Sequence, residues 1–286
     1  MSSFQPGRER KHIWRDDFLL IVSLVVFVGV VYALDSAVQP VFRSRSLLLL
    51  MGVFLALVPA IIWLVFFYRQ DRLEPEPKQF VLAIFVLGAL LASAVGVPLV
   101  ESLFRVSHWI YADTLTTILG SILVVGFAQE FLKYAAVRYS VYHSPEFNEP
   151  TDGVIYATAA GLGYATVLNI QFVVSNGGVD LGAGVIRIAV VALAHAAFSG
   201  ITGYFLGRAK FESEPIWWMP LGISLAAVAS GLFNWVRGRV VQGGVDLTGA
   251  TAHAWLGLAL AAVVALATTA VILWLVRRQI RSIQAS

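Results

Sequence analysis

The sequence predicts an all-α polytopic membrane protein with about eight transmembrane helices in one domain. Of its 286 residues, 58% are hydrophobic and only 13% are charged, and the mean hydropathy is +0.79. A soluble domain of this length would need more charged residues to cover its surface. The hydrophobic residues also gather in long stretches, and this pattern is typical of membrane spans.

Eight apolar stretches are each long enough to cross about 30 Å of hydrocarbon as a helix. They cover residues 18–34, 47–68, 80–100, 115–137, 152–175, 185–207, 216–236 and 252–276. The first stretch could instead be a signal peptide, because basic residues precede it. It is long for that role and no A-x-A cleavage site follows, so we interpret it as an uncleaved helix. Residues 1–17 and 277–286 are then tails outside the domain 18–276.

The basic residues predict that both tails lie in the cytoplasm. Six of the 20 Lys and Arg residues lie on one side of the predicted spans: Arg43, Arg45, Arg105, Arg187, Arg237 and Arg239. The other 14 lie in the tails, in the loops on the tails' side or at the ends of the spans that face this side. Because cytoplasmic segments carry an excess of Lys and Arg, this distribution fixes the predicted orientation.

Composition also excludes several kinds of function. The chain has no cysteine, which excludes disulfides, a cysteine nucleophile and zinc held by thiolates. The net charge of +3 is modest, and the basic residues are explained by topology, so we expect the lipid bilayer and not nucleic acid as the surroundings.

The candidate functional residues are the polar side chains inside the apolar spans, because their burial in a bilayer is costly. They are Gln129, Glu130, Lys133, Asn169, His195 and Asn234. Structural roles remain open: Glu130 and Lys133 could be an i,i+3 ion pair, and His195 could hydrogen-bond across a helix interface. At 1.5 Å per residue, Glu130 lies about 22 Å from the outer end of its predicted helix and Asn234 about 3 Å.

Six short motifs follow one another through the middle of the chain. They are Phe67-Tyr-Arg-Gln-Asp-Arg-Leu-Glu-Pro-Glu-Pro77, Gln129-Glu-Phe-Leu-Lys133, Glu149-Pro-Thr-Asp-Gly-Val-Ile-Tyr156, Gly161-Leu-Gly-Tyr-Ala-Thr-Val-Leu-Asn169, Ala194-His195 with the later Gly203-Tyr-Phe-Leu-Gly-Arg-Ala-Lys-Phe211, and Ser230-Gly-Leu-Phe-Asn234. In order and spacing they resemble the PrsW family of intramembrane proteases, relatives of the CAAX-protease-like membrane enzymes. The resemblance covers about residues 55–236 and implies a PrsW-like helical bundle in a prokaryotic plasma membrane.

The resemblance implies a peptidase in which carboxylates and imidazoles converge on one water molecule, with a divalent metal as the only implied cofactor. Glu130 and His195 match the catalytic positions. Lys133, Asp152, Asn169 and Asn234 match supporting positions.

Three positions depart from the family pattern. Gln129 stands where the family has the first Glu of E-E-x-x-K, Leu168 stands for the Glu before Asn169, and Ser230 stands for a His. Glutamine cannot act as a base and leucine has no polar atom. One Glu and one His also fall short of the three protein ligands usual for catalytic zinc.

Three functions remain open. The first is a PrsW-like fold that no longer hydrolyses peptides and binds a single-span membrane protein or a transmembrane helix. The second is an active intramembrane protease that cleaves a single-span regulatory protein with Glu130 and His195 alone. The third is a transporter or channel that uses the same buried ionisable groups.

Overall fold

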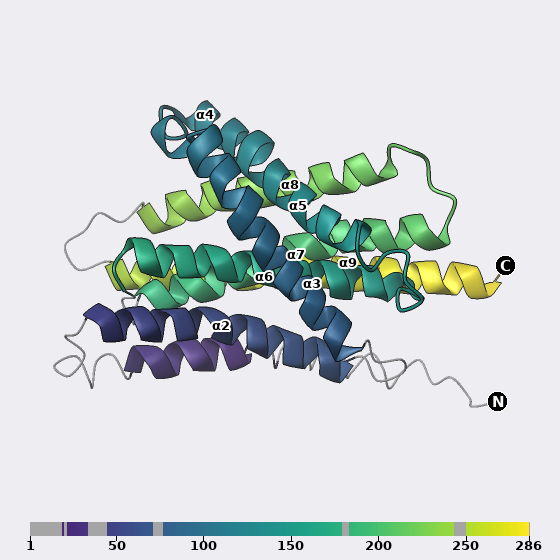
Figure 1. Ribbon diagram of the computed structural model, residues 1–286, viewed down its shortest axis with the longest axis horizontal. Helices are drawn as coiled ribbons and strands as arrows, with labels where there is room; N and C mark the ends of the chain where they lie inside the picture. Colours follow the sequence, from purple (N-terminus) through teal and green to yellow (C-terminus); the bar gives the residue numbers. More distant parts are fainter. Residues whose placement is uncertain are drawn as a thin grey trace.

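Every regular element of the structure is a helix. The computed structural model describes residues 19, 22–33, 45–70, 77–178, 183–242 and 250–285, and no strand occurs among them. Most of the helices run side by side along the long axis of the molecule, and α3 crosses them obliquely (Figure 1).

The elements follow one another in the order of the predicted spans. After the helix Val22–Ala33 come α2 (Arg45–Gln70), α3 (Lys78–Leu91), the π-helices η1 (Ala92–Gly96) and η2 (Pro98–Leu103), the 3₁₀ turn η3 (Val106–His108), α4 (Thr114–Gly120), the π-helix η4 (Ser121–Gly126), α5 (Phe127–Arg138), α6 (Pro150–Ser175), α7 (Ala183–Phe211), α8 (Trp218–Gln242) and α9 (Ala250–Ala285).

Seven helical runs among the described residues are long and apolar enough to cross a membrane, and they confirm the last seven predicted spans. They are Arg45–Val65, Lys78–His108, Thr114–Arg138, Pro150–Ser175, Gly184–Phe211, Trp218–Gly238 and Trp255–Ile272. The predicted first span is represented by the shorter helix Val22–Ala33. The ends of that span and the tail 1–17 lie outside the described residues, apart from residue 19.

Small residues bring α6 against its neighbours. A side chain at Gly153 would collide with the backbone of α7 at Gly203, and one at Gly163 would collide with the carbonyl of Phe85 on α3. At Gly161 an added methyl group would meet Ser199 and the carbonyl of His195. These contacts place α6 and α7 at the centre of the bundle, where close backbone approach depends on glycine.

The two ends of the bundle differ in their loops. We call one the basic end: it holds the α5–α6 turn, the α7–α8 turn and the last turns of α9, at the right of Figure 1. There the Lys210 Nζ donates hydrogen bonds to the carbonyl oxygens of Tyr142 (2.6 Å) and Phe147 (2.5 Å) and so ties α7 to the α5–α6 turn. The segment Phe104–Asp113, which joins η2 to α4, lies at the opposite end.

Candidate active site

A buried row of polar and aromatic side chains connects α5, α6 and α7. The Lys133 Nζ donates a 2.6 Å hydrogen bond to Glu130 Oε1, and both side chains are fully buried. The same Nζ lies 5.6 Å from the ring centroid of Tyr164. The Tyr164 ring is stacked on His195 with 5.7 Å between centroids. The structure therefore brings Glu130 and His195 into one cluster, through Lys133 and Tyr164.

Several polar atoms of the predicted site residues have no hydrogen-bond partner within the described residues. They are Gln129 Oε1, Glu130 Oε2, Asn169 Oδ1 and His195 Nδ1, all of them buried. Buried polar groups are normally paired, and those that are not often mark places where a ligand or water binds. Glu130 therefore has one oxygen committed to Lys133 and one oxygen available.

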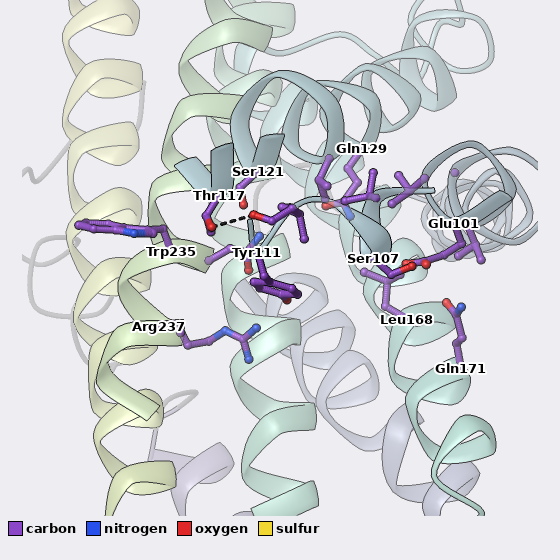
Figure 2. A pocket seen from close by; sticks show the side chains of 18 of the residues that line it. Glu101, Ser107, Tyr111, Thr117, Ser121, Gln129, Leu168, Gln171, Trp235 and Arg237 are labelled. Atoms are coloured by element: carbon purple, nitrogen blue, oxygen red, sulfur yellow. Dashed lines mark hydrogen bonds between the residues drawn. The ribbon is translucent and has the colours of Figure 1, made fainter. Parts of the chain in front are cut away.

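A cavity of about 650 Å³ opens next to the cluster, towards the end that holds Phe104–Asp113. Tyr164 lines this cavity and so joins it to the buried row. Three of the predicted positions also line it: Gln129, Leu168 and Asn234. Figure 2 shows Gln129 and Leu168 facing this space, with Tyr111 between α8 and the rest of the lining. Its volume falls within the usual range for ligand sites.

The π-helices η1, η2 and η4 shape this region. The wider turn of η1 ends at Gly96, where an added methyl group would collide with the Tyr164 hydroxyl. The π-helix η4 directly precedes α5 and thus sets the position of Gln129 and Glu130 on the next turn. π-turns inside helices are rare and frequently occur at functional sites.

Three of the predicted site residues lie elsewhere. Asp152 caps the start of α6 at the basic end, where its carboxylate accepts hydrogen bonds from the backbone of Asn148 (2.7 Å) and Glu149 (2.6 Å). Asn169 donates a 3.1 Å hydrogen bond to the carbonyl of Ile188 on α7. Ser230 is buried on α8 and, among the described residues, is not part of the cavity lining. Asp152 and Asn169 thus serve contacts within or between helices.

Sequence reasoning missed some residues of the site. Tyr164 links the cavity to the buried row, yet it was passed over as part of a glycine-rich motif. Arg237 lines the cavity, and basic residues on that side were interpreted only as topology signals. Arg187 and Arg237 both lie within the bounds of membrane-spanning helices. A basic residue in such a position is itself a signal of a functional site.

Asp113 lines the mouth of the cavity and begins α4. Its carboxylate accepts hydrogen bonds from the hydroxyl (2.5 Å) and the backbone amide (2.9 Å) of Thr116. These bonds favour the charged form and lower the pKa of Asp113 below its usual value.

Residues 76–276 match the sequence pattern of a family described as "PrsW family intramembrane metalloprotease". The chain belongs to the PrsW family. The match runs from the start of α3 into α9, whereas the motifs placed the resemblance at about 55–236. Most of the motif 67–77 therefore precedes the matched region, and residues 71–76 of it lie outside the described part.

Curated relatives support the same family. The chain is 29% identical to the protease PrsW of Geobacillus kaustophilus over 62% of this chain and 76% of that protein. It is 31% identical to the protease PrsW of Halalkalibacterium halodurans, over 63% and 80% of the two chains. For the protease PrsW of Bacillus subtilis the identity is 27%, over 63% and 79%. No solved structure matches the chain.

The donor atoms present do not fit the metal that the family description implies. Within the described part of the chain, no group of three or more His, Cys, Asp or Glu side chains is arranged to hold a metal ion. A catalytic zinc site usually has three protein ligands. Glu130 gives one oxygen to Lys133, and Gln129, Leu168 and Ser230, where the resemblance implies Glu and His, have no carboxylate or imidazole to offer a metal. We derive no catalytic step through a metal.

Proposed function

We propose that this PrsW-family protein binds a transmembrane segment of a single-span membrane protein and does not hydrolyse it. One observation carries the proposal: Gln129 and Leu168 line the cavity, at positions where the resemblance to the family implies carboxylates. Peptide hydrolysis needs a group that takes a proton from water. An amide and an alkyl side chain cannot take that proton.

The remaining carboxylate supports the proposal as well. Glu130 is fully buried and is neutralised by the Lys133 ammonium at 2.6 Å. Its Oε1 already accepts the hydrogen bond of Lys133, and a buried ion pair that loses one charge leaves the other without a counter-charge, which is costly. We propose that the Glu130–Lys133 pair has a structural role: it neutralises both charges within α5, and Lys133 faces the Tyr164 ring of α6 at 5.6 Å.

We further propose that the protein resides in a prokaryotic plasma membrane with both termini in the cytoplasm. The relatives named above are all bacterial. In this orientation the basic end of the bundle faces the cytoplasm, following the positive-inside rule. The cavity then opens towards the exterior, where a partner's extracytoplasmic flank would enter it.

One observation favours the alternative of an active protease. Glu130 Oε2 and His195 Nδ1 are both buried without a partner in the described part of the chain. Glu130 as a base and His195 as a water-orienting group would give a minimal site that uses only these two side chains. The experiments below distinguish this alternative from the proposal.

Binding is tested by photocrosslinking in the native membrane. A photoreactive amino acid replaces Leu168 on the cavity wall, and another replaces Leu82, which is 56% exposed on α3. We expect crosslinks to an intact single-span protein from position 168 and not from position 82. Equal crosslinking from both positions would mean that the cavity does not select a partner.

Cleavage is tested with the crosslinked partner in lipid nanodiscs. We expect the parent protein to leave it intact and the triple variant Gln129→Glu, Leu168→Glu, Ser230→His to bind a divalent metal and to cleave weakly. The single restorations should do little, because residues of one catalytic unit are not additive. Cleavage by the parent that Glu130→Gln or His195→Ala abolishes would overturn the proposal in favour of the protease.

A further inference from the structure

Two arginines at or beside the cavity form no ion pair within the described part of the chain. Within the described residues, the ion pairs are Glu130 with Lys133 and Arg208 with Glu212 and Glu214. Arg187 on α7 and Arg237 on α8 take part in none of them. Arg187 lies beside the cavity, because Phe172, whose ring covers its guanidinium group, directly follows Gln171 of the cavity lining.

One hydrogen-bond donor of Arg187 has no acceptor among the described residues. Its guanidinium carbon lies 3.7 Å from the ring centroid of Phe172, so one face is covered by an aromatic ring. The Nη1 atom is buried and has no hydrogen-bond partner in the described part of the chain. A guanidinium group normally uses its donors in pairs on a carboxylate or phosphate, and a buried donor without an acceptor is costly.

Arg237 connects this charge to the cavity. It lines the space together with Tyr111 and Asn234. Figure 2 shows Arg237 on the side of Tyr111, with Glu101 and Gln171 across the view. Asp113 also lines the cavity, and both of its oxygens are bonded to Thr116. Within the described residues, neither Glu101 nor Asp113 forms an ion pair with Arg187 or Arg237.

We propose that Arg187 and Arg237 together bind a carboxylate of the partner polypeptide, an Asp or Glu side chain in the segment that flanks its transmembrane helix. This inference rests on the proposed function and names the partner's chemistry. We expect a polypeptide and not a lipid as the ligand, because Arg237 lines the same cavity as Gln129 and Leu168, where the proposed function places the partner. Hydroxyl and amide side chains of Ser107, Thr117 and Gln171 line the same space and suit a peptide backbone.

The test uses the purified protein in nanodiscs of zwitterionic lipid and two synthetic single-span peptides. The peptides are identical except that the flank carries two Glu residues in one and two Gln residues in the other. We expect the protein to bind the Glu peptide at least about tenfold more tightly, the effect of one charge-assisted contact. The double variant Arg187→Gln, Arg237→Gln should abolish this preference, so that the two peptides bind it with about the same Kd.

Matched variants separate this role from a general charge effect. Arg105 is exposed near the same end and is not part of the cavity lining, so Arg105→Gln should keep the preference. Arg237→Lys keeps the charge and loses the two-pronged geometry, so it should give an intermediate preference. Thermal unfolding of each variant is measured beside the binding, and we expect no loss of Tm in the double variant, since it removes unpaired buried charges.

The outcomes distinguish this inference from the proposed function. If neither peptide binds the parent protein, the proposed function fails. If both bind equally, or the double variant keeps the preference, the function stands and the arginine site is refuted. Native mass spectrometry compares the anionic lipid bound to the parent protein and to the double variant. If the double variant binds less anionic lipid but keeps the peptide preference, the arginines bind a lipid headgroup and the inference is wrong. A gain in affinity for the Glu peptide on Asp180→Asn or Asp246→Asn would mean that the chain itself neutralises the arginines, which also refutes it.

Discussion

Glu130 and Lys133 lie on the same turn of α5, and both are fully buried, so neither charge can be removed alone at low cost. The pair explains why two charged residues are tolerated within a membrane span: each provides the other's counter-charge. It also limits the chemistry of Glu130, because the loss of its charge would leave the buried charge of Lys133 without a counter-charge.

Removing one member of the pair should therefore destabilise the protein strongly. We expect Lys133→Met to lower the free energy of unfolding by about 3–5 kcal/mol, because Glu130 would be left buried without a partner. The double variant Glu130→Leu, Lys133→Leu should be neutral or stabilising. Both are measured by reversible unfolding in detergent micelles or bicelles.

The matched control is the half-exposed pair of Arg208 and Glu212, with 2.8 Å between Nε and Oε2. Because that pair is partly solvated, Glu212→Gln should cost no more than about 1 kcal/mol. If Lys133→Met is as mild as this control, the charges at residues 130 and 133 do not stabilise each other.

Sequence reasoning identified single residues only where polarity was unexpected. Glu130 and His195 were found because charge is rare within apolar spans, and the structure places them in one cluster. Tyr164 was not found, because an aromatic residue in a membrane helix carries no such signal. Asp152 was carried over from the motif, and only the structure shows that it caps α6.

At the scale of the elements, α4 depends on the carboxylate of Asp113 at its start. Because hydrogen bonds from Thr116 lower the pKa of Asp113 in the folded state, this carboxylate stabilises the helix start above the unfolded pKa of about 4. The contribution is lost as the pH falls through the folded pKa. We expect the amide of Thr116 to lose protection from hydrogen exchange below about pH 4.

The variant Asp113→Asn serves as the reference at each pH. Asparagine also caps helices but has no carboxyl group to titrate in this range. In Asp113→Asn, the hydrogen-exchange protection of the Thr116 amide, corrected for the intrinsic exchange rate, should not change with pH. A parallel loss in both proteins would show that the acid effect arises elsewhere.

Two glycine substitutions should have opposite effects, because only one of the two glycines lies in a close contact between helices, that of α6 with α3. Gly163→Ala forces a methyl group against the carbonyl of Phe85 and should cost about 1–3 kcal/mol. Gly29→Ala, in the helix Val22–Ala33, meets no atom within 4 Å and should stabilise by up to about 1 kcal/mol through helix propensity. Thermal unfolding of both variants in one detergent measures the difference, and equal shifts would contradict the close packing.

Sequence periodicity predicted where the spans lie but not how their backbones turn. The predicted span 80–100 corresponds to α3, η1 and part of η2, and 115–137 corresponds to most of α4, η4 and α5. Apolar side chains fit α-helical and π-helical turns equally well, so composition carries no signal for the places where α-helix changes to π-helix. The π-turns depend on tertiary contacts such as that of Gly96 with Tyr164.

For the whole molecule, the distribution of basic residues predicts its orientation. A cytoplasm-dependent reporter fused after residue 286 should be active, and one inserted in the segment 243–249 should be inactive. A reporter that works only outside the cytoplasm should give the reverse at both sites. Activity in the opposite pattern at both positions would refute the orientation and would place the cavity on the cytoplasmic side.

The burial of α6 and α7 has a consequence for biosynthesis. Of the seven candidate spans in the described residues, α6 is the least apolar, and most of it is covered by protein and not by lipid. A segment of this kind partitions weakly into a bilayer by itself as it leaves the ribosome. We therefore expect α6 to be integrated efficiently only after α7 has been synthesised and can pair with it. A nascent chain truncated after Ser175 would then leave α6 partly outside the membrane.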